Sequence, residues 1–104
     1  MNLFVREDEN NRLILKLPKL IDLKNGIEVK DSINRELDKN DCESYVLDLS
    51  DLEFIDSLGL GILVGIQRRT YGYSKKLFFL NPRPSIKKVF EVTQLQRVFN
   101  IIEE

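Results

Sequence analysis

Apolar and polar residues alternate in short stretches along this chain, and turn-forming residues bound each stretch. Residues 3–5 and 13–17 are apolar or alternating and flank a polar segment at 9–11, a pattern that predicts a β-hairpin. Pro18 ends the second strand, because proline has no N–H to donate to a strand ladder. Further apolar runs predict three more strands, at residues 45–49, 75–80 and 98–102.

Between these strands, the spacing of apolar residues predicts three helices. The first runs from Asn25 to about Asp38, and Asn25 with Glu28 is expected to form a capping box at its start. The second follows residue 55 and can end at Gly72. The third begins at residues 81–85, which place a proline in its first turn. Its inner face is predicted to consist of Ile86, Val89 and Phe90.

The predicted order is strand, strand, helix, strand, helix, strand, helix, strand. Alternation of this kind is typical of right-handed crossovers between parallel strands. We therefore expect an α/β fold with a mostly parallel, mixed sheet of about five strands and about three helices packed against it. A length of 104 residues with 42% hydrophobic content suits one domain, spanning residues 1–104.

Composition restricts the chemistry that this chain can perform. It contains no histidine, which is the usual general base and the commonest metal ligand, so we expect no enzymatic activity and no bound cofactor. The single cysteine, Cys42, cannot form an internal disulfide and is expected to be an incidental loop residue. No apolar run approaches the roughly 20 residues of a membrane span, and the first residues do not resemble a signal peptide, so we expect a cytoplasmic protein.

The basic residues concentrate toward the C-terminus. The whole chain has a net charge of −1, yet residues 68–104 hold eight basic side chains against three acidic ones. A patch of this kind could bind nucleic acid. The alternative is that these residues line the solvated faces of helices, and their scatter favours it. They are Arg68, Arg69, Lys75, Lys76, Arg83, Lys87, Lys88 and Arg97.

The second predicted helix begins with two residues that favour a helix N-cap and contains three glycines. Asp56 and Ser57 are both residue types that favour a helix N-cap, and the helix that follows is apolar on nearly every face, so we expect it to be mostly buried. Gly59, Gly61 and Gly65 each weaken such a helix by ~1 kcal/mol relative to alanine, so we expect a close backbone approach that needs their small size. Their spacing does not match the G-x-G-x-x-G of dinucleotide-binding loops.

Carboxylates cluster in the turn before this helix and offer a second interpretation. Acidic side chains at the end of a strand can hold magnesium, as in phosphatase-type sites. The simpler alternative is that they form turns and cap the helix. They are Asp48, Asp51, Glu53 and Asp56.

Ser57 itself is a candidate for a regulated hydroxyl. A helix N-terminus has unpaired amides and a partial positive charge, so a phosphate on Ser57 would be held well there. The same phosphate adds about −1.5 to −2 charges beside Asp56, enough to disrupt an apolar or acidic interface. The alternative is a serine that serves only as an N-cap.

The strand at 46–50 and the segment from Phe54 to Gly61 together resemble the STAS domains typified by bacterial anti-sigma factor antagonists. The resemblance lies in an Asp-Ser-x-Gly-Leu-Gly signature that begins at Asp56, and the predicted order of elements matches over essentially the whole chain. It implies a STAS-type fold with helices on one side of the sheet. It also implies a protein that binds an anti-sigma factor of the histidine-kinase-like ATPase type and so regulates transcription indirectly, without binding nucleic acid or membrane.

In such proteins the kinase phosphorylates the signature serine, here Ser57, which ends binding until a phosphatase restores it. ATP belongs to the partner. The loop aspartate of the family corresponds to Asp22, which is expected near Ser57 on a shared partner-binding surface with Asp56, Leu58 and Gly59.

Two positions depart from the family pattern. Leu58 stands where a small residue is usual, and Lys19 stands where a glycine is usual. Both are expected at the contact face and could select a different partner. The alternative function is therefore a STAS interaction scaffold in a larger signalling or stress-sensing assembly, with Ser57 unphosphorylated. Binding of a small ligand such as a nucleotide or lipid also stays open.

Overall fold

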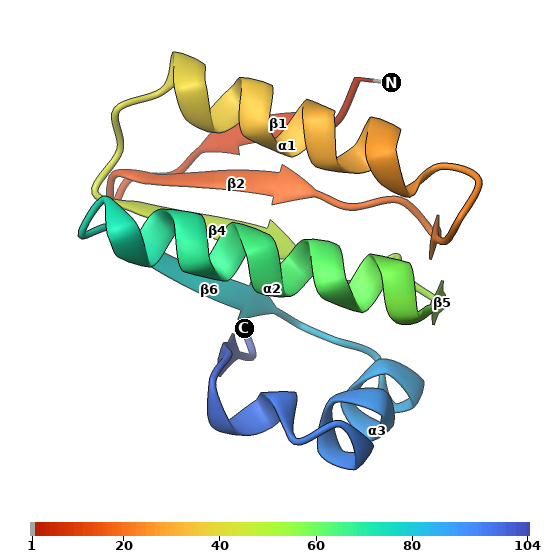
Figure 1. Ribbon diagram of the computed structural model, residues 1–104. Helices are drawn as coiled ribbons and strands as arrows, with labels where there is room; N and C mark the ends of the chain where they lie inside the picture. The colour runs from red at the N-terminus through yellow and green to blue at the C-terminus, as the bar shows by residue number, and fades with distance from the viewer. Residues whose placement is uncertain (1) are drawn as a thin grey trace.

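A computed structural model describes residues 2–104 and shows a layer of helices on a mixed sheet (Figure 1). The predicted elements are present, with boundaries shifted by a few residues, and two short strands and a 3-10 turn are added. In chain order they are β1 (Phe4–Glu7), β2 (Arg12–Lys16), β3 (Leu20–Ile21), α1 (Gly26–Lys39), β4 (Ser44–Asp48), β5 (Phe54–Ile55), α2 (Ser57–Gly72), β6 (Lys76–Leu80), α3 (Pro84–Val92), η1 (Leu95–Arg97) and β7 (Asn100–Ile102).

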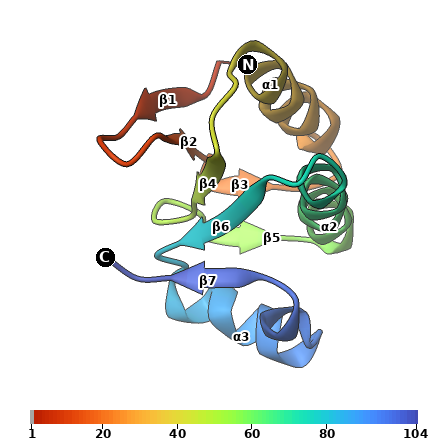
Figure 2. The same cartoon turned by 90° about the vertical axis from the view of Figure 1, so that its left-hand side faces the viewer.

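The five-stranded sheet has the order β1-β2-β4-β6-β7. β1 and β2 form the predicted antiparallel hairpin, with Phe4 opposite Lys16. The pairs β2–β4, β4–β6 and β6–β7 are all parallel, as the alternation of strands and helices predicts. α1 and α2 lie side by side on one face of this sheet and run in the same direction (Figures 1 and 2). The expected α/β fold, with a mostly parallel, mixed sheet of five strands, is therefore confirmed.

The core lies between the inner face of the sheet and the three helices. Alternate strand residues, among them Leu15, Leu47 and Phe79, are fully buried and pack against the apolar faces of the helices. α3 joins this core through Ile86 and Phe90, two of the three residues predicted for its inner face, and the third, Val89, is partly buried.

An aromatic cluster anchors the C-terminal part of the chain to the sheet. The ring of Phe99 stacks on Phe79 with a centroid separation of 4.1 Å, and Phe90 meets Phe99 edge-on at 5.3 Å. Phe99 was expected within the last strand. Instead, η1 precedes it and β7 begins one residue after it, because packing its side chain into the core takes precedence over an extended backbone.

A second sheet was missed by the sequence pattern. β3 and β5 pair in parallel, with Leu20 opposite Phe54 and Ile21 opposite Ile55. Each strand has two residues, too few for an alternating pattern to be visible, and the segment around residue 20 was expected to be a loop. This small sheet lies at the N-terminal ends of α1 and α2 and positions the segments that enter both helices (Figures 1 and 2).

The expected capping box of α1 is wrong. Asn25 occupies the N-cap position, but its side chain does not cap the helix. Its Oδ1 accepts a hydrogen bond from the backbone N–H of Asp22 at 2.9 Å, and its Nδ2 donates to the carbonyl of Leu20 at 2.7 Å. The side-chain amide therefore stabilises the loop before the helix. Its two bonds to loop backbone take the place of the expected bond to the helix N-terminus.

The three glycines of α2 have different environments. A Cβ added to Gly59 would lie 2.5 Å from Ile55 Cγ1 and 2.9 Å from the carbonyl oxygen of Ile21, so the expected close approach is confirmed there. At Gly61 and Gly65 the added Cβ would meet no atom of the described residues within 4 Å, so the same expectation is wrong. Both lie on an exposed face of α2, and the helix is less buried than its composition predicts.

This difference predicts opposite effects of two alanine substitutions. Gly59→Ala is expected to destabilise the domain by about 1–3 kcal/mol, because backbone and side-chain atoms block the new methyl group. Gly61→Ala is expected to stabilise it by up to about 1 kcal/mol through helix propensity. Urea unfolding followed by circular dichroism measures both, with Gly65→Ala as the matched control for Gly61→Ala. A loss of stability at Gly61 would contradict this account of α2.

Candidate functional site

Ser57 is the first residue of α2, and its side chain is exposed. The N-cap is Asp56, whose Oδ1 accepts a hydrogen bond from the backbone N–H of Gly59 at 2.9 Å. The interpretation of Ser57 as an N-cap is therefore wrong, because the carboxylate one residue earlier fills that role. The hydroxyl of Ser57 makes no hydrogen bond to any residue in 2–104, so it is available to solvent or to another molecule.

The second oxygen of Asp56 ties the start of α2 to the loop before α1. Asp56 Oδ2 accepts a hydrogen bond from the backbone N–H of Leu23 at 2.9 Å. One carboxylate thus satisfies two backbone donors that lie far apart in the sequence. The backbone carbonyl of Asp56 also accepts a hydrogen bond from the N–H of Leu60. The backbone that carries Ser57 is therefore fixed by bonds within α2 and by the bond to the loop before α1.

Asp22 occupies the corresponding position after β3. The register of Ile21 with Ile55 brings Asp22 to the position next to Asp56 at the end of the small sheet. Its Oδ1 accepts from the N–H groups of Lys24 and Asn25, at 2.9 and 3.3 Å. Asp22 therefore shapes the loop at this end of the molecule, and its carboxylate already has two backbone partners.

Apolar side chains surround this pair of aspartates, and the sequence pattern missed them. Leu23 is 78% exposed and Phe54 is 54% exposed, and Leu20 is also exposed opposite Phe54. We use the name Ser57 surface for the region formed by these apolar residues with the two aspartates and the serine, namely Leu20, Asp22, Leu23, Phe54, Asp56 and Ser57. The available signal was the presence of leucines on both sides of Asp22 in a segment otherwise expected to be a polar loop.

The two remaining residues predicted to contact a partner are less accessible. Leu58 is half-buried, and its Cδ2 lies 3.1 Å from the position a Cβ would take on Gly26, so it packs between α1 and α2. Gly59 is buried beneath the Ser57 surface. Lys19 is exposed, and its carbonyl accepts hydrogen bonds from the N–H groups of Glu53 and Phe54.

Three of the four acidic side chains in the turn before α2 have structural partners. Asp48 Oδ1 accepts from the N–H of Ser50 at 2.9 Å, and Asp51 lies 3.5 Å from the ammonium of Lys16. Among residues 2–104 no group of three or more acidic or cysteine side chains is placed to hold a metal ion. For Asp48 and Asp56 the interpretation as turn former and cap is confirmed.

The basic residues of the C-terminal third do not form one patch. They are distributed over α2, β6, α3, η1 and the segments between them. Three of them form ion pairs with acidic side chains, namely Arg69 with Asp38, Lys75 with Asp41 and Lys87 with Glu103. This arrangement favours solvated surfaces over a nucleic-acid site.

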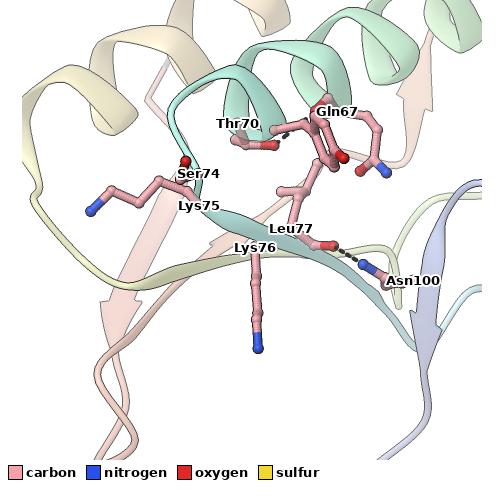
Figure 3. A pocket seen from close by; sticks show the side chains of 8 residues that line it. Gln67, Thr70, Ser74, Lys75, Lys76, Leu77 and Asn100 are labelled. Carbon is pink, nitrogen blue, oxygen red and sulfur yellow. Dashed lines mark hydrogen bonds between the residues drawn. The ribbon is translucent and has the colours of Figure 1, made fainter.

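A cavity of about 450 Å³ lies at the opposite end of α2 from Ser57 (Figure 3). Two of its polar groups already have partners within the chain: the Thr70 hydroxyl donates to the carbonyl of Gln67 at 3.0 Å, and Asn100 Nδ2 donates to the carbonyl of Leu77 at 3.3 Å. Lys75, which also lines it, extends to Asp41. The cavity contains none of the predicted site residues.

Cys42 lies in the loop between α1 and β4, as expected, but it is not incidental. Its side chain is buried and belongs to the core cluster. Burial raises the pKa of the thiol, and the negative charges of Glu7 and Asp41 raise it further. The thiol therefore stays protonated near neutral pH and acts as a small apolar side chain.

Each helix in the described part of the chain is too short or too polar to span a bilayer. The site so described is an exposed serine at the capped N-terminus of a helix, with exposed apolar side chains on the adjoining strands and loop, on an α/β domain with its helices on one face.

Comparison with known proteins agrees with this architecture. Over residues 3–104 the chain matches the STAS domain, so it belongs to the STAS domain family. It is 26% identical over 105 aligned residues to an anti-sigma F factor antagonist of Paenibacillus polymyxa, covering 99% of this chain and 89% of that protein.

Solved structures show the same fold. A putative anti-sigma factor antagonist from Thermotoga maritima superposes with a TM-score of 0.84 at 25% identity, covering 98% of this chain and 86% of that one. The anti-sigma factor antagonist SpoIIAA in its unphosphorylated form gives a TM-score of 0.78, covering 98% and 87% of the two chains. SpoIIAA from Bacillus in its phosphorylated form gives 0.71, covering 98% and 90%, and both forms are 19% identical to this chain.

Because Asp56 makes two hydrogen bonds and Ser57 makes none, alanine substitution is expected to destabilise the domain at position 56 and not at position 57. Asp56→Ala is expected to lower the free energy of unfolding by about 1–2 kcal/mol, because it removes the helix cap and the bond to Leu23. Ser57→Ala is expected to change it by less than about 0.5 kcal/mol, because the hydroxyl makes no bond. Urea titration at pH 7 measures both. Equal losses for the two variants would contradict the assignment of Asp56 as the cap.

Proposed function

We propose that this chain is an anti-sigma factor antagonist that binds a kinase-type anti-sigma factor through the Ser57 surface. Phosphorylation of Ser57 by that partner, with the partner's own ATP, ends binding, and a phosphatase restores it. The chain itself acts by binding and needs no cofactor. In this role it works in the cytoplasm and controls transcription indirectly, by releasing the sigma factor that the partner holds.

The observation that carries the proposal is the placement of the Ser57 hydroxyl. It is exposed, it has no hydrogen bond within residues 2–104, and it sits on a backbone that Asp56 holds in place. A kinase needs an accessible hydroxyl. A protein-binding surface also needs exposed apolar anchors, and Leu23 and Phe54 provide them next to the serine.

The same geometry explains how a phosphate would act as a switch. It would add about −1.5 to −2 charges next to the carboxylates of Asp22 and Asp56, on a surface that binding would remove from water. Desolvating that charge opposes association. If this opposition amounts to about 2.8 kcal/mol, the affinity for the partner falls about a hundredfold.

The names of the relatives support the proposal at two levels. The Paenibacillus relative aligned over nearly the whole chain carries the name of an anti-sigma F factor antagonist. SpoIIAA, which has the same fold, is known in a phosphorylated and an unphosphorylated form, so phosphorylation is compatible with this architecture.

Three baits test the proposal: the wild-type chain, Ser57→Ala and Ser57→Asp. Each is used to purify partners from the native host, and the anti-sigma factor retained by the wild type is then purified and titrated calorimetrically. We expect Ser57→Ala to bind like the wild type, and Ser57→Asp to bind about a hundredfold more weakly because of its added charge. Incubation with the partner and ATP should phosphorylate Ser57 in the wild type, as peptide mass spectrometry would show.

Ser85→Asp is the matched control, because Ser85 is also exposed in the first turn of a helix, α3. It should bind like the wild type. Retention of the same partners by wild type, Ser57→Ala and Ser57→Asp, with no kinase among them, would reject the switch and favour the scaffold function.

A further inference from the structure

A groove runs between α1 and α2, and Ser57 lies at one end of it. It has a volume of about 390 Å³ and is lined by residues of these two helices. α1 and α2 run side by side in the same direction, and their N-termini share one end of the molecule (Figure 1). From Ser57 to Arg69, both of which line the groove, α2 extends about 18 Å at 1.5 Å per residue, or about three helical turns.

The lining of the groove is largely apolar. Ile27 of α1 is 54% exposed, and Leu58, Ile62 and Ile66 of α2 also line the groove. Gly61 and Gly65 lie along its α2 side, where the absence of side chains keeps it open. No contact within the described residues requires glycine at these two positions, although each weakens the helix by ~1 kcal/mol relative to alanine.

The charges that line the groove are positive. Its lining includes Lys30 and Arg69 and no acidic residue. Arg69 is engaged with Asp38 and with Asn34, so its charge is already matched and it bridges the two helices. Lys30 forms no ion pair with any residue in the range 2–104. An occupant that fits this groove therefore presents apolar side chains together with a carboxylate.

The walls of the groove determine which type of backbone it can accept. Both are helices, whose interior N–H and C=O groups are bonded within each helix, so an extended peptide would find no strand edge to pair with. A helix satisfies its own backbone groups and needs only side-chain contacts. Glycines in one wall allow such a helix to approach closely.

We propose that this groove binds an amphipathic helix of the anti-sigma factor, which places apolar side chains between α1 and α2 and an acidic side chain against Lys30. The inference rests on the proposed function and adds a contact to it. The groove is continuous with the Ser57 surface, because Ser57 belongs to both. A phosphate on Ser57 then also repels the acidic side chain of the bound helix, which strengthens the switch.

The test uses the purified anti-sigma factor that the wild-type chain retains. Gly65→Leu fills the groove and is expected to weaken binding at least about tenfold, since overpacking excludes the partner helix, while unfolding stability is maintained by the better helix former. Lys30→Glu is expected to weaken binding about tenfold at low salt and less at high salt, because charges at the surface are screened.

Two controls isolate the groove. Gly72→Leu changes another unobstructed glycine of α2 that does not line the groove, and Lys88→Glu changes an exposed lysine of α3. Both should bind the anti-sigma factor like the wild type. Urea unfolding of every variant shows that the domain is folded.

The outcomes separate this inference from the proposed function. If Gly65→Leu and Lys30→Glu bind normally while Ser57→Asp does not, the groove is empty in the complex and the inference is wrong, but the proposed function stands. If no anti-sigma factor binds the wild-type chain, both are wrong. If sedimentation shows that the wild type self-associates and that Gly65→Leu abolishes this without affecting partner binding, the occupant is a second copy and the inference is overturned.

Discussion

The close packing of α2 on the small β3–β5 sheet determines how the rest of the site is arranged. At Gly59 the helix backbone lies against Ile55 and the carbonyl of Ile21, nearer than any side chain would allow. That approach brings Asp56 within reach of the N–H of Leu23, and the resulting bond connects the entrances of α1 and α2. The orientation of Ser57, the exposure of the neighbouring apolar residues and the start of the inter-helix groove all follow from this contact.

Apolar patterns that extend over a whole strand or helix predicted the main fold, because they reflect which side chains are buried. The alternation in β2 and the apolar runs of β4 and β6 correspond to side chains that the sheet and helices exclude from water, so the order of elements along the chain and the mostly parallel pairing followed from them. Elements of only two residues, and side chains that bond to nearby loop backbone, left no such pattern. β3 and β5 have two residues each, and the side chain of Asn25 bonds to loop backbone in place of the helix, a choice that its residue type does not reveal.

The site was predictable in part for the same reason. Asp56 and Ser57 stood out because their residue types favour a helix start, but the sequence could not distinguish the N-cap from the first helical residue, which depends on one backbone torsion. The role of glycine at position 59 followed from its cost within a helix, whereas the exposure of Gly61 and Gly65 required the position of α1. The leucines beside Asp22 were the one sequence signal for the apolar part of the Ser57 surface, because its arrangement depends on the β3–β5 register, which the sequence pattern did not predict.

The assignment of the cap to Asp56 and of the free hydroxyl to Ser57 divides two tasks between adjacent residues. The side chain of Asp56 stabilises the fold through its two hydrogen bonds, whereas the side chain of Ser57 makes none. A domain built in this way tolerates a change of side chain at position 57 and still folds. The surface at this end of the molecule can therefore change its chemistry at position 57 without disturbing the contacts that hold α1 and α2 together.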